Sequence, residues 1–100
     1  MSRAERTVTV GSRVGLHARP ASLFVQAVGA SGHAVTIAKP SGESADGASI
    51  LSVLGLAVMH GEQLLVTVEG EDPERVANEL ATLIASDLDA DEATVNPQKR

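Results

Sequence analysis

The chain of 100 residues is 43% hydrophobic and 21% charged, which suffices for one globular domain with a modest core and is too little for two. Its single aromatic residue, Phe24, and its net charge of −5 exclude the aromatic platforms and the basic surface of a nucleic-acid-binding protein. Because the chain has no cysteine, disulfides, thiolate catalysis and zinc–thiolate sites are excluded as well.

The N-terminal segment lacks the apolar run of a secretory signal. The longest apolar stretch, residues 50–59, falls short of the roughly 20 residues that cross a bilayer. We therefore expect a cytoplasmic protein with no membrane insertion.

The first half of the chain alternates strand and helix signals. Alternating polar and β-branched residues predict a strand at 6–10. The spacing of apolar residues after Pro20 predicts a helix that ends near Gly29 or Gly32. A second alternating segment at 35–39 and a short strand at 43–46, joined by a Pro-Ser-Gly turn, indicate a hairpin.

A short apolar segment follows Ser49. With serine in the N-cap position, residues 50–56 fit a short helix whose inward side chains are Val53 and Leu56. A strand is the alternative, because β-branched Val53 and Gly55 both lower helix propensity.

The last elements are a strand at 63–68 and a helix that Asp72 caps and Pro73 begins. Apolar residues recur along this helix with the period of a helix, at Val76, Leu80, Leu83, Ile84 and Leu88. The polar segment 89–100 is expected to be a tail. The order of elements predicts an α+β fold, with helices on one face of an antiparallel sheet in a single domain over residues 1–100.

The segment His17-Ala18-Arg19-Pro20-Ala21 carries the chemistry. Proline favours the first turn of a helix, so His17 and Arg19 are expected to flank a helix start, where unpaired N–H groups and the helix dipole attract anions. Imidazole is a nucleophile at physiological pH, and a guanidinium can hold a phosphate with two hydrogen bonds. The motif predicts a phosphoryl site in which the backbone of Ala18 and Arg19 also binds phosphate.

This motif, together with the segment Ser49 to Leu56, resembles HPr, the histidine phosphocarrier family of the bacterial phosphoenolpyruvate-dependent sugar phosphotransferase system. The resemblance covers roughly residues 6–88. It implies an open-faced two-layer sandwich, a four-stranded antiparallel sheet in the order 1-4-2-3, and three helices on one face. A monomer without a cofactor or metal is the family expectation.

The resemblance also implies the roles of individual residues. His17 would accept a phosphoryl group on Nδ1 from enzyme I and give it to the IIA domain of a sugar permease, which makes the chain a carrier rather than an enzyme. Ile50, Leu51 and Leu54 match the family's apolar docking patch, although a short helix must also bury part of such a set in the core.

Ser49 matches the family's regulatory serine, which an HPr kinase/phosphorylase modifies in some members. A capping role explains the same residue. Ala48 replaces a common lysine of regulated members, and Leu51-Ser52 replaces a Met-Gly pattern, so both departures weigh against control by a kinase.

Three other polar residues have simpler interpretations. His33 and His60 lie beside glycines in predicted loops, without a second ligand at metal spacing, and are expected to be surface histidines. Lys39 ends a strand and is either a basic contact for an acidic partner or an ordinary surface lysine.

Two rival functions stay open at this point. One is an HPr-like regulatory protein that reports carbon or nitrogen status through its phosphorylation. The other is a histidine-dependent phosphatase or transferase acting on a small substrate, for which the sequence offers no second acid or base and no nucleotide-binding loop.

Overall fold

A computed structural model describes residues 2–13 and 15–86. The elements in chain order are β1 (Ser2–Thr9), α1 (Ala18–Ser31), β2 (Ala34–Ala38), β3 (Ser44–Asp46), α2 (Ile50–Gly55), β4 (Gln63–Gly70) and α3 (Pro73–Ala85). This order and the helical state of residues 50–55 confirm the predicted elements. Leu88 and the predicted tail at 89–100 lie outside the described residues.

The four strands form one antiparallel sheet in the order β1-β4-β2-β3, as predicted. β1 pairs with β4 along its whole length, from Ser2 opposite Gly70 to Thr9 opposite Gln63. Both strands are longer than the sequence predicted. In β1, Ala4 is buried between two exposed charged residues, so the alternation of the strand continues toward its start. This segment lacks the β-branched residues typical of strands, and the sequence therefore did not predict it as part of the strand.

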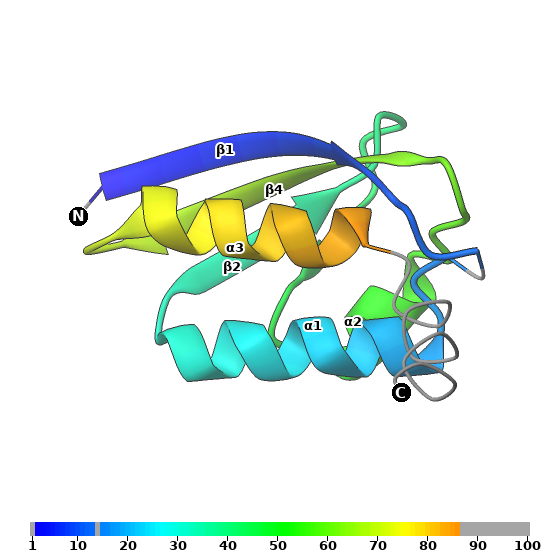
Figure 1. Ribbon diagram of the computed structural model, residues 1–100, viewed down its shortest axis with the longest axis horizontal. Helices are drawn as coiled ribbons and strands as arrows, with labels where there is room; N and C mark the ends of the chain where they lie inside the picture. Colours follow the sequence, from blue (N-terminus) through cyan, green and yellow to red (C-terminus); the bar gives the residue numbers. More distant parts are fainter. Residues whose placement is uncertain (1, 14, 87–100) are drawn as a thin grey trace, which may run out of the picture.

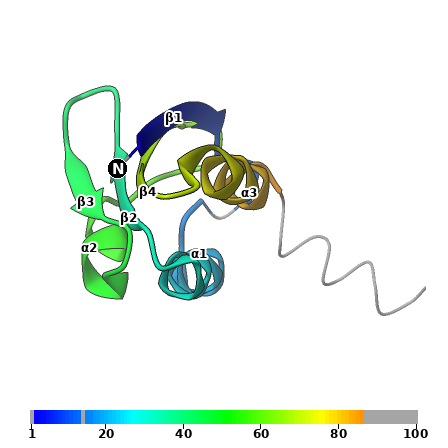
Figure 2. The same ribbon diagram turned by 90° about the vertical axis from the view of Figure 1, so that its left-hand side faces the viewer.

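The fold has two layers, with all three helices on one face of the sheet (Figures 1 and 2). α1 and α3 run side by side in opposite directions, and α2 lies beside the N-terminal half of α1. The opposite face of the sheet is open. This is the predicted α+β open-faced sandwich.

The core lies between the layers and is almost entirely aliphatic around the single aromatic ring, Phe24. Every second strand residue points into it, as a pleated sheet requires. Its fully buried large side chains include Phe24, Val28, Ile37, Val53, Leu64, Val66, Val68, Val76, Leu80 and Ile84. Within residues 2–13 and 15–86, no helix has the length and apolar character needed to cross a membrane.

The observed start of α1 differs from the predicted one, whereas its end is as predicted. α1 starts at Ala18, so Pro20 occupies the third helical position rather than the first. Its missing N–H still costs nothing there, because the first-turn donors have no acceptor within the helix. α1 ends at Gly32, whose φ of +72° is the left-handed C-cap conformation that glycine favours.

Asp72 stands at the N-cap position of α3, but the prediction that it caps this helix was wrong. Its carboxylate makes no capping hydrogen bond and instead accepts one from Arg75 Nε at 2.8 Å. Pro73 begins the helix as expected. The two carboxylates around Arg75, those of Asp72 and Glu79, raise the pKa of its guanidinium by stabilising the charged form.

Candidate functional site

The N-terminus of α1 presents a histidine and an arginine to solvent. His17 is the N-cap residue, with an extended backbone, and its carbonyl accepts the N–H of Ala21 at 2.9 Å. Its imidazole makes no capping hydrogen bond and is exposed, as are Ala18 and Arg19 in the first turn. The structure thus brings together the residues that the sequence singled out for phosphate binding.

This arrangement suits an anion held at the helix start. The first N–H groups of a helix point outward along its axis and cannot bond within the helix. In α1 these donors belong to Ala18 and Arg19, since Pro20 has none and is buried. A phosphoryl group on the imidazole of His17 would therefore lie next to two backbone donors, the positive end of the dipole and a guanidinium.

The loop before His17 is fixed against the chain that follows α2. Leu16 is buried, and its N–H donates to the carbonyl of Val58 at 3.0 Å. Gly15 has a φ of +70°, and a Cβ at this position would lie 2.2 Å from the Val58 oxygen. Only glycine allows this close approach of the two backbones.

A second group of contacts holds the Val58 segment in turn. Lys39 Nζ donates to the carbonyl of Leu56 at 3.0 Å and lies 3.6 Å from Glu62 Oε1. The same Glu62 oxygen accepts the N–H of Met59 at 2.7 Å. The Lys39 side chain is only 14% exposed. The interpretation of Lys39 as an ordinary surface lysine is therefore wrong, because its side chain stabilises the support of the histidine loop.

Residue Ala57, in this supporting segment, has a φ of +53°, which is left-handed backbone that favours glycine. Its N–H donates to the carbonyl of Leu54 at 3.0 Å, directly after α2. The segment therefore carries backbone strain next to the histidine loop.

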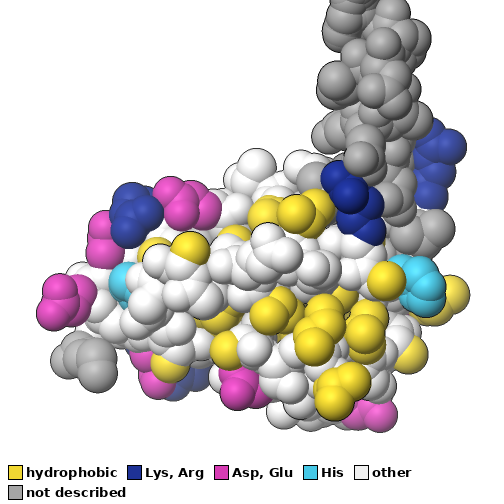
Figure 3. All heavy atoms as spheres, turned by 90° about the horizontal axis from the view of Figure 1, so that it is seen from below, with side chains coloured by type: hydrophobic (Ala, Val, Ile, Leu, Met, Phe, Trp, Pro, Cys, Tyr) yellow, Lys and Arg dark blue, Asp and Glu magenta, His cyan; other side chains and the backbone are white. Residues whose placement is uncertain are grey.

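α2 carries exposed apolar side chains. Leu51 is 79% exposed and Ile50 is 37% exposed, whereas Leu54 is half-buried against the core. Val53 and Leu56 are buried, as the sequence predicted. Hydrophobic side chains also gather in the space-filling view of the face that carries α1 and α2 (Figure 3).

Met59 was missed by the sequence interpretation. Its side chain is 63% exposed, and its Cα would lie 2.9 Å from a Cβ on Gly15, which places it beside the histidine loop. An apolar residue in the turn before His60-Gly61 was the available signal.

Ser49 is the N-cap of α2, as predicted. Its hydroxyl accepts the N–H of Ser52 at 3.2 Å, and the residue is half-buried.

His60 is exposed, in agreement with the sequence, but His33 is not a plain surface histidine. The ring of His33 is partly buried, with Nδ1 2.8 Å from the carbonyl of Ser31, and its Nε2 accepts the N–H of Asp72 at 3.0 Å. His33 therefore joins the end of α1 to the start of α3. No group of three or more His, Asp or Glu side chains suited to a metal ion occurs in the described part of the chain.

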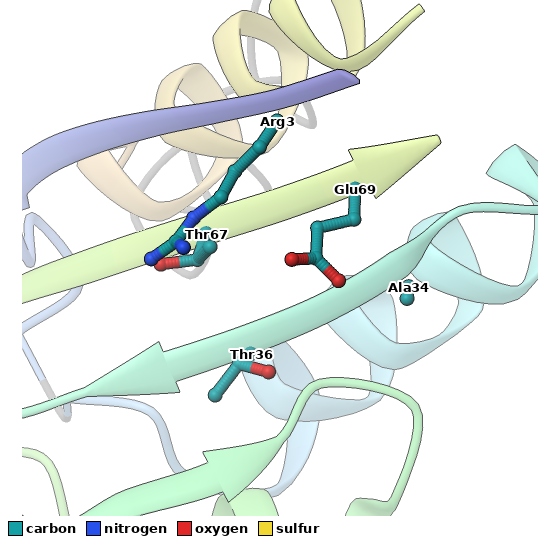
Figure 4. Close-up of a pocket in the computed structure, with 5 residues that line it drawn as sticks. All are labelled: Arg3, Ala34, Thr36, Thr67 and Glu69. Atoms are coloured by element: carbon teal, nitrogen blue, oxygen red, sulfur yellow. The ribbon is translucent and has the colours of Figure 1, made fainter. Parts of the chain in front are cut away.

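A shallow hollow on the open face of the sheet is separate from this site (Figure 4). Its lining side chains come from β1, β2 and β4 and are Arg3, Ala34, Thr36, Thr67 and Glu69. These residues alternate with the buried ones, so the hollow lies on the face away from the helices and from His17.

Comparison with known proteins agrees with the fold and the motif. The family described as "PTS HPr component phosphorylation site" matches residues 4–86. The phosphocarrier protein HPr of Streptomyces coelicolor is 48% identical over 86 residues, which cover 86% of this chain and 92% of that protein. The HPr-like protein Crh of Bacillus subtilis is 31% identical over 84 residues, or 84% of this chain and 98% of that protein.

Solved structures agree as well. The crystal structure of a phosphocarrier protein HPr from Bacillus anthracis superimposes with a TM-score of 0.78 at 32% identity, over 84% of this chain and 99% of that one. The fold and the matched residues thus define a phosphocarrier protein. The chain belongs to the HPr family of the phosphotransferase system.

Proposed function

We propose that His17 accepts a phosphoryl group from phosphorylated enzyme I and passes it to IIA components of sugar permeases. In this proposal a single HPr domain acts in the cytoplasm as a monomeric, stoichiometric carrier, without a cofactor or metal. The observation that carries it is an exposed imidazole at the N-cap of α1, next to the first-turn residues Ala18 and Arg19. The nucleophile is accessible to a large protein donor.

The transfer balances without another reactant. A neutral imidazole nitrogen, Nδ1 by the family resemblance, attacks the phosphorus of the donor, and the donor's own bond to phosphorus breaks. The reverse exchange on a IIA protein returns His17 to its starting state. The helix start stabilises the added negative charge, and Arg19 contributes a second set of donors.

The direct test is incubation with enzyme I and phosphoenolpyruvate, followed by mass spectrometry. We expect one acid-labile phosphate on His17, complete loss of labelling in His17→Ala, and slower labelling in Arg19→Ala. His60→Ala is the matched control, because it removes another exposed histidine and is expected to leave labelling unchanged. Labelling that survives in His17→Ala would reject the proposal.

A regulatory role is the second candidate. The similarity to Crh, which is described as the catabolite repression HPr of Bacillus subtilis, supports it. The two candidates are separated by the acceptor of the phosphoryl group. Transfer to a sugar-specific IIA protein supports the carrier, whereas transfer only to a nitrogen-type IIA protein supports the regulator.

Ser49 is the proposed position for control by an HPr kinase/phosphorylase. Its hydroxyl already acts as the cap of α2, which explains the residue without a kinase. Incubation with such a kinase and ATP, with Ser49→Ala as control, tests the assignment: phosphate on Ser49 supports it, and an unmodified protein rejects it.

A further inference from the structure

The histidine loop is held at both of its ends by the chain between α2 and β4. At the start of the loop, the N–H of Val10 donates to the carbonyl of Glu62 at 2.9 Å. At its end, the N–H of Leu16 donates to the carbonyl of Val58 at 3.0 Å. Both acceptors belong to a supporting segment, residues 56–62, which therefore determines where the backbone of the loop lies.

Glu62 holds the supporting segment with its backbone and with its side chain. Its N–H donates to the carbonyl of Met59 at 3.1 Å, which closes a turn. Its carboxylate oxygen Oε1 accepts the N–H of Met59 at 2.7 Å and lies 3.6 Å from Lys39 Nζ. One carboxylate thus fixes the turn of the segment and pairs it with a cation that follows β2.

Lys39 is the second anchor, and it is the one lysine in the part of the chain that the structure describes. Its backbone is fixed in the turn after β2, because its N–H donates to the carbonyl of Glu43 at 2.7 Å. Its Nζ donates to the carbonyl of Leu56, the C-cap residue of α2, at 3.0 Å. The last carbonyls of a helix have no acceptor role within it, and a lysine amino group satisfies one of them here. The sheet is therefore tied to both halves of the supporting segment.

We propose that Lys39 and Glu62 are a positioning pair for phosphoryl transfer at His17. The inference rests on the proposed function, because that transfer is the reaction that the pair affects. Both residues lie outside the first turn of α1 and act through the backbone of the histidine loop. The attacking nitrogen must face the phosphorus of the donor, and a misplacement of about 1 Å can slow such a reaction on the order of a hundredfold.

The two side chains depend on each other. Without the amino group of Lys39, the Glu62 carboxylate keeps only the N–H of Met59, and the carbonyl of Leu56 loses its donor. Without the charge of Glu62, Lys39 loses the carboxylate that faces it at 3.6 Å. Groups in one such network show non-additive effects when both are changed. We therefore expect the second substitution to add little to the first.

The test measures phosphoryl transfer from phosphorylated enzyme I in single-turnover reactions, with full-length variants under conditions in which urea unfolding shows each to be folded. Varying the concentration of enzyme I separates binding of the donor from the rate constant at saturation. Lys39→Met is expected to lower this rate constant roughly tenfold and to leave the half-saturating concentration within roughly twofold. Glu62→Gln is expected to have a smaller effect in the same direction, because its amide oxygen can still accept the N–H of Met59.

Rescue and a matched control separate positioning from a general loss of structure. Lys39→Arg retains a charged donor and is expected to stay within roughly threefold of the wild-type rate constant. Glu43→Gln is the matched control, since the Glu43 carboxylate lies 3.9 Å from the same lysine but belongs to the turn between β2 and β3. It removes the same charge and is expected to leave the rate constant unchanged.

The double variant Lys39→Met/Glu62→Gln is expected to be no more than roughly twofold slower than Lys39→Met alone. The proposal is overturned if folded Lys39→Met reacts at the wild-type rate, if only its half-saturating concentration changes, or if the two losses are additive. An effect of Glu43→Gln as large as that of Glu62→Gln would overturn it as well. Failure of the proposed function has a different sign, because the wild-type protein would then carry no phosphate on His17.

Discussion

Replacing Gly15 with alanine perturbs the contact that positions the histidine loop. The φ of +70° costs a residue with a Cβ about 1–2 kcal/mol. The new Cβ would lie 2.2 Å from the oxygen of Val58 and 2.9 Å from the Cα of Met59, so the two backbones must separate. Separation breaks the hydrogen bond from Leu16 N–H to Val58, worth about 0.5–1.5 kcal/mol. We expect a total destabilisation of about 1.5–3.5 kcal/mol.

Gly32→Ala is the matched control. Its φ of +72° imposes nearly the same backbone strain, but a Cβ at this position would have no neighbour within 4 Å. It is expected to cost about 1–2 kcal/mol, the strain alone. The change that alanine makes to the entropy of the unfolded chain is common to both variants and cancels in the comparison.

Urea unfolding of the two variants measures the difference, and the rate of labelling by enzyme I measures its effect on the site. Gly15→Ala is expected to be the less stable of the two by about 1 kcal/mol and to be phosphorylated more slowly. The reasoning is refuted if Gly15→Ala loses no more stability than Gly32→Ala, or if a folded Gly15→Ala protein is labelled at the wild-type rate.

Substitutions at three positions test the other supports of the site, all by urea unfolding. Ser49→Ala removes the cap of α2 and is expected to cost about 1 kcal/mol, while Ser49→Asp retains an acceptor and most of the stability; equal losses would argue against capping. Lys39→Met removes the donor to the Leu56 carbonyl and is expected to cost about 1–2 kcal/mol, whereas a neutral result would mean that the bond contributes nothing. Ala57→Gly relieves a φ of +53° and is expected to gain up to about 1 kcal/mol; a loss would show that the position is not strained.

The sequence predicted the elements well where one periodic pattern dominated. Strands with β-branched alternation and the apolar spacing of α3 are local signals, and tertiary packing agrees with them. Boundaries were less accurate. β1 starts earlier than predicted because pairing with β4, rather than propensity, decides the state of Ser2 to Glu5.

The candidate site was predicted as a motif but not as a structure. His17, Ala18 and Arg19 are adjacent in the chain, so their meeting at a helix start needed only local reasoning. Their support did not, because Gly15 approaches Val58 and Lys39 reaches Leu56 across distant parts of the sequence. Such contacts depend on how β2, α2 and the histidine loop pack against one another. A pattern within one short segment of the sequence does not predict this packing.

The misassigned residues have the same cause. His33 and Asp72 lie 39 residues apart, and their hydrogen bond forms only because the end of α1 and the start of α3 meet at one end of the fold. Asp72 has the residue type and position of an N-cap, yet Arg75 takes its carboxylate. The Asp72 carboxylate could accept either from the N–H groups of the helix start or from Arg75, and its position in the sequence does not decide which hydrogen bond forms.

The eight residues of β1 separate the N-terminal end of the sheet from the site (Figure 1). At about 3.3 Å per residue, the strand places Ser2 roughly 25 Å from the turn that leads to His17. A fluorophore or an affinity tag joined before Ser2 would therefore project from the far end of the molecule. Surface immobilisation through that end leaves the histidine pointing toward the solution, which is the geometry that binding measurements on this protein need.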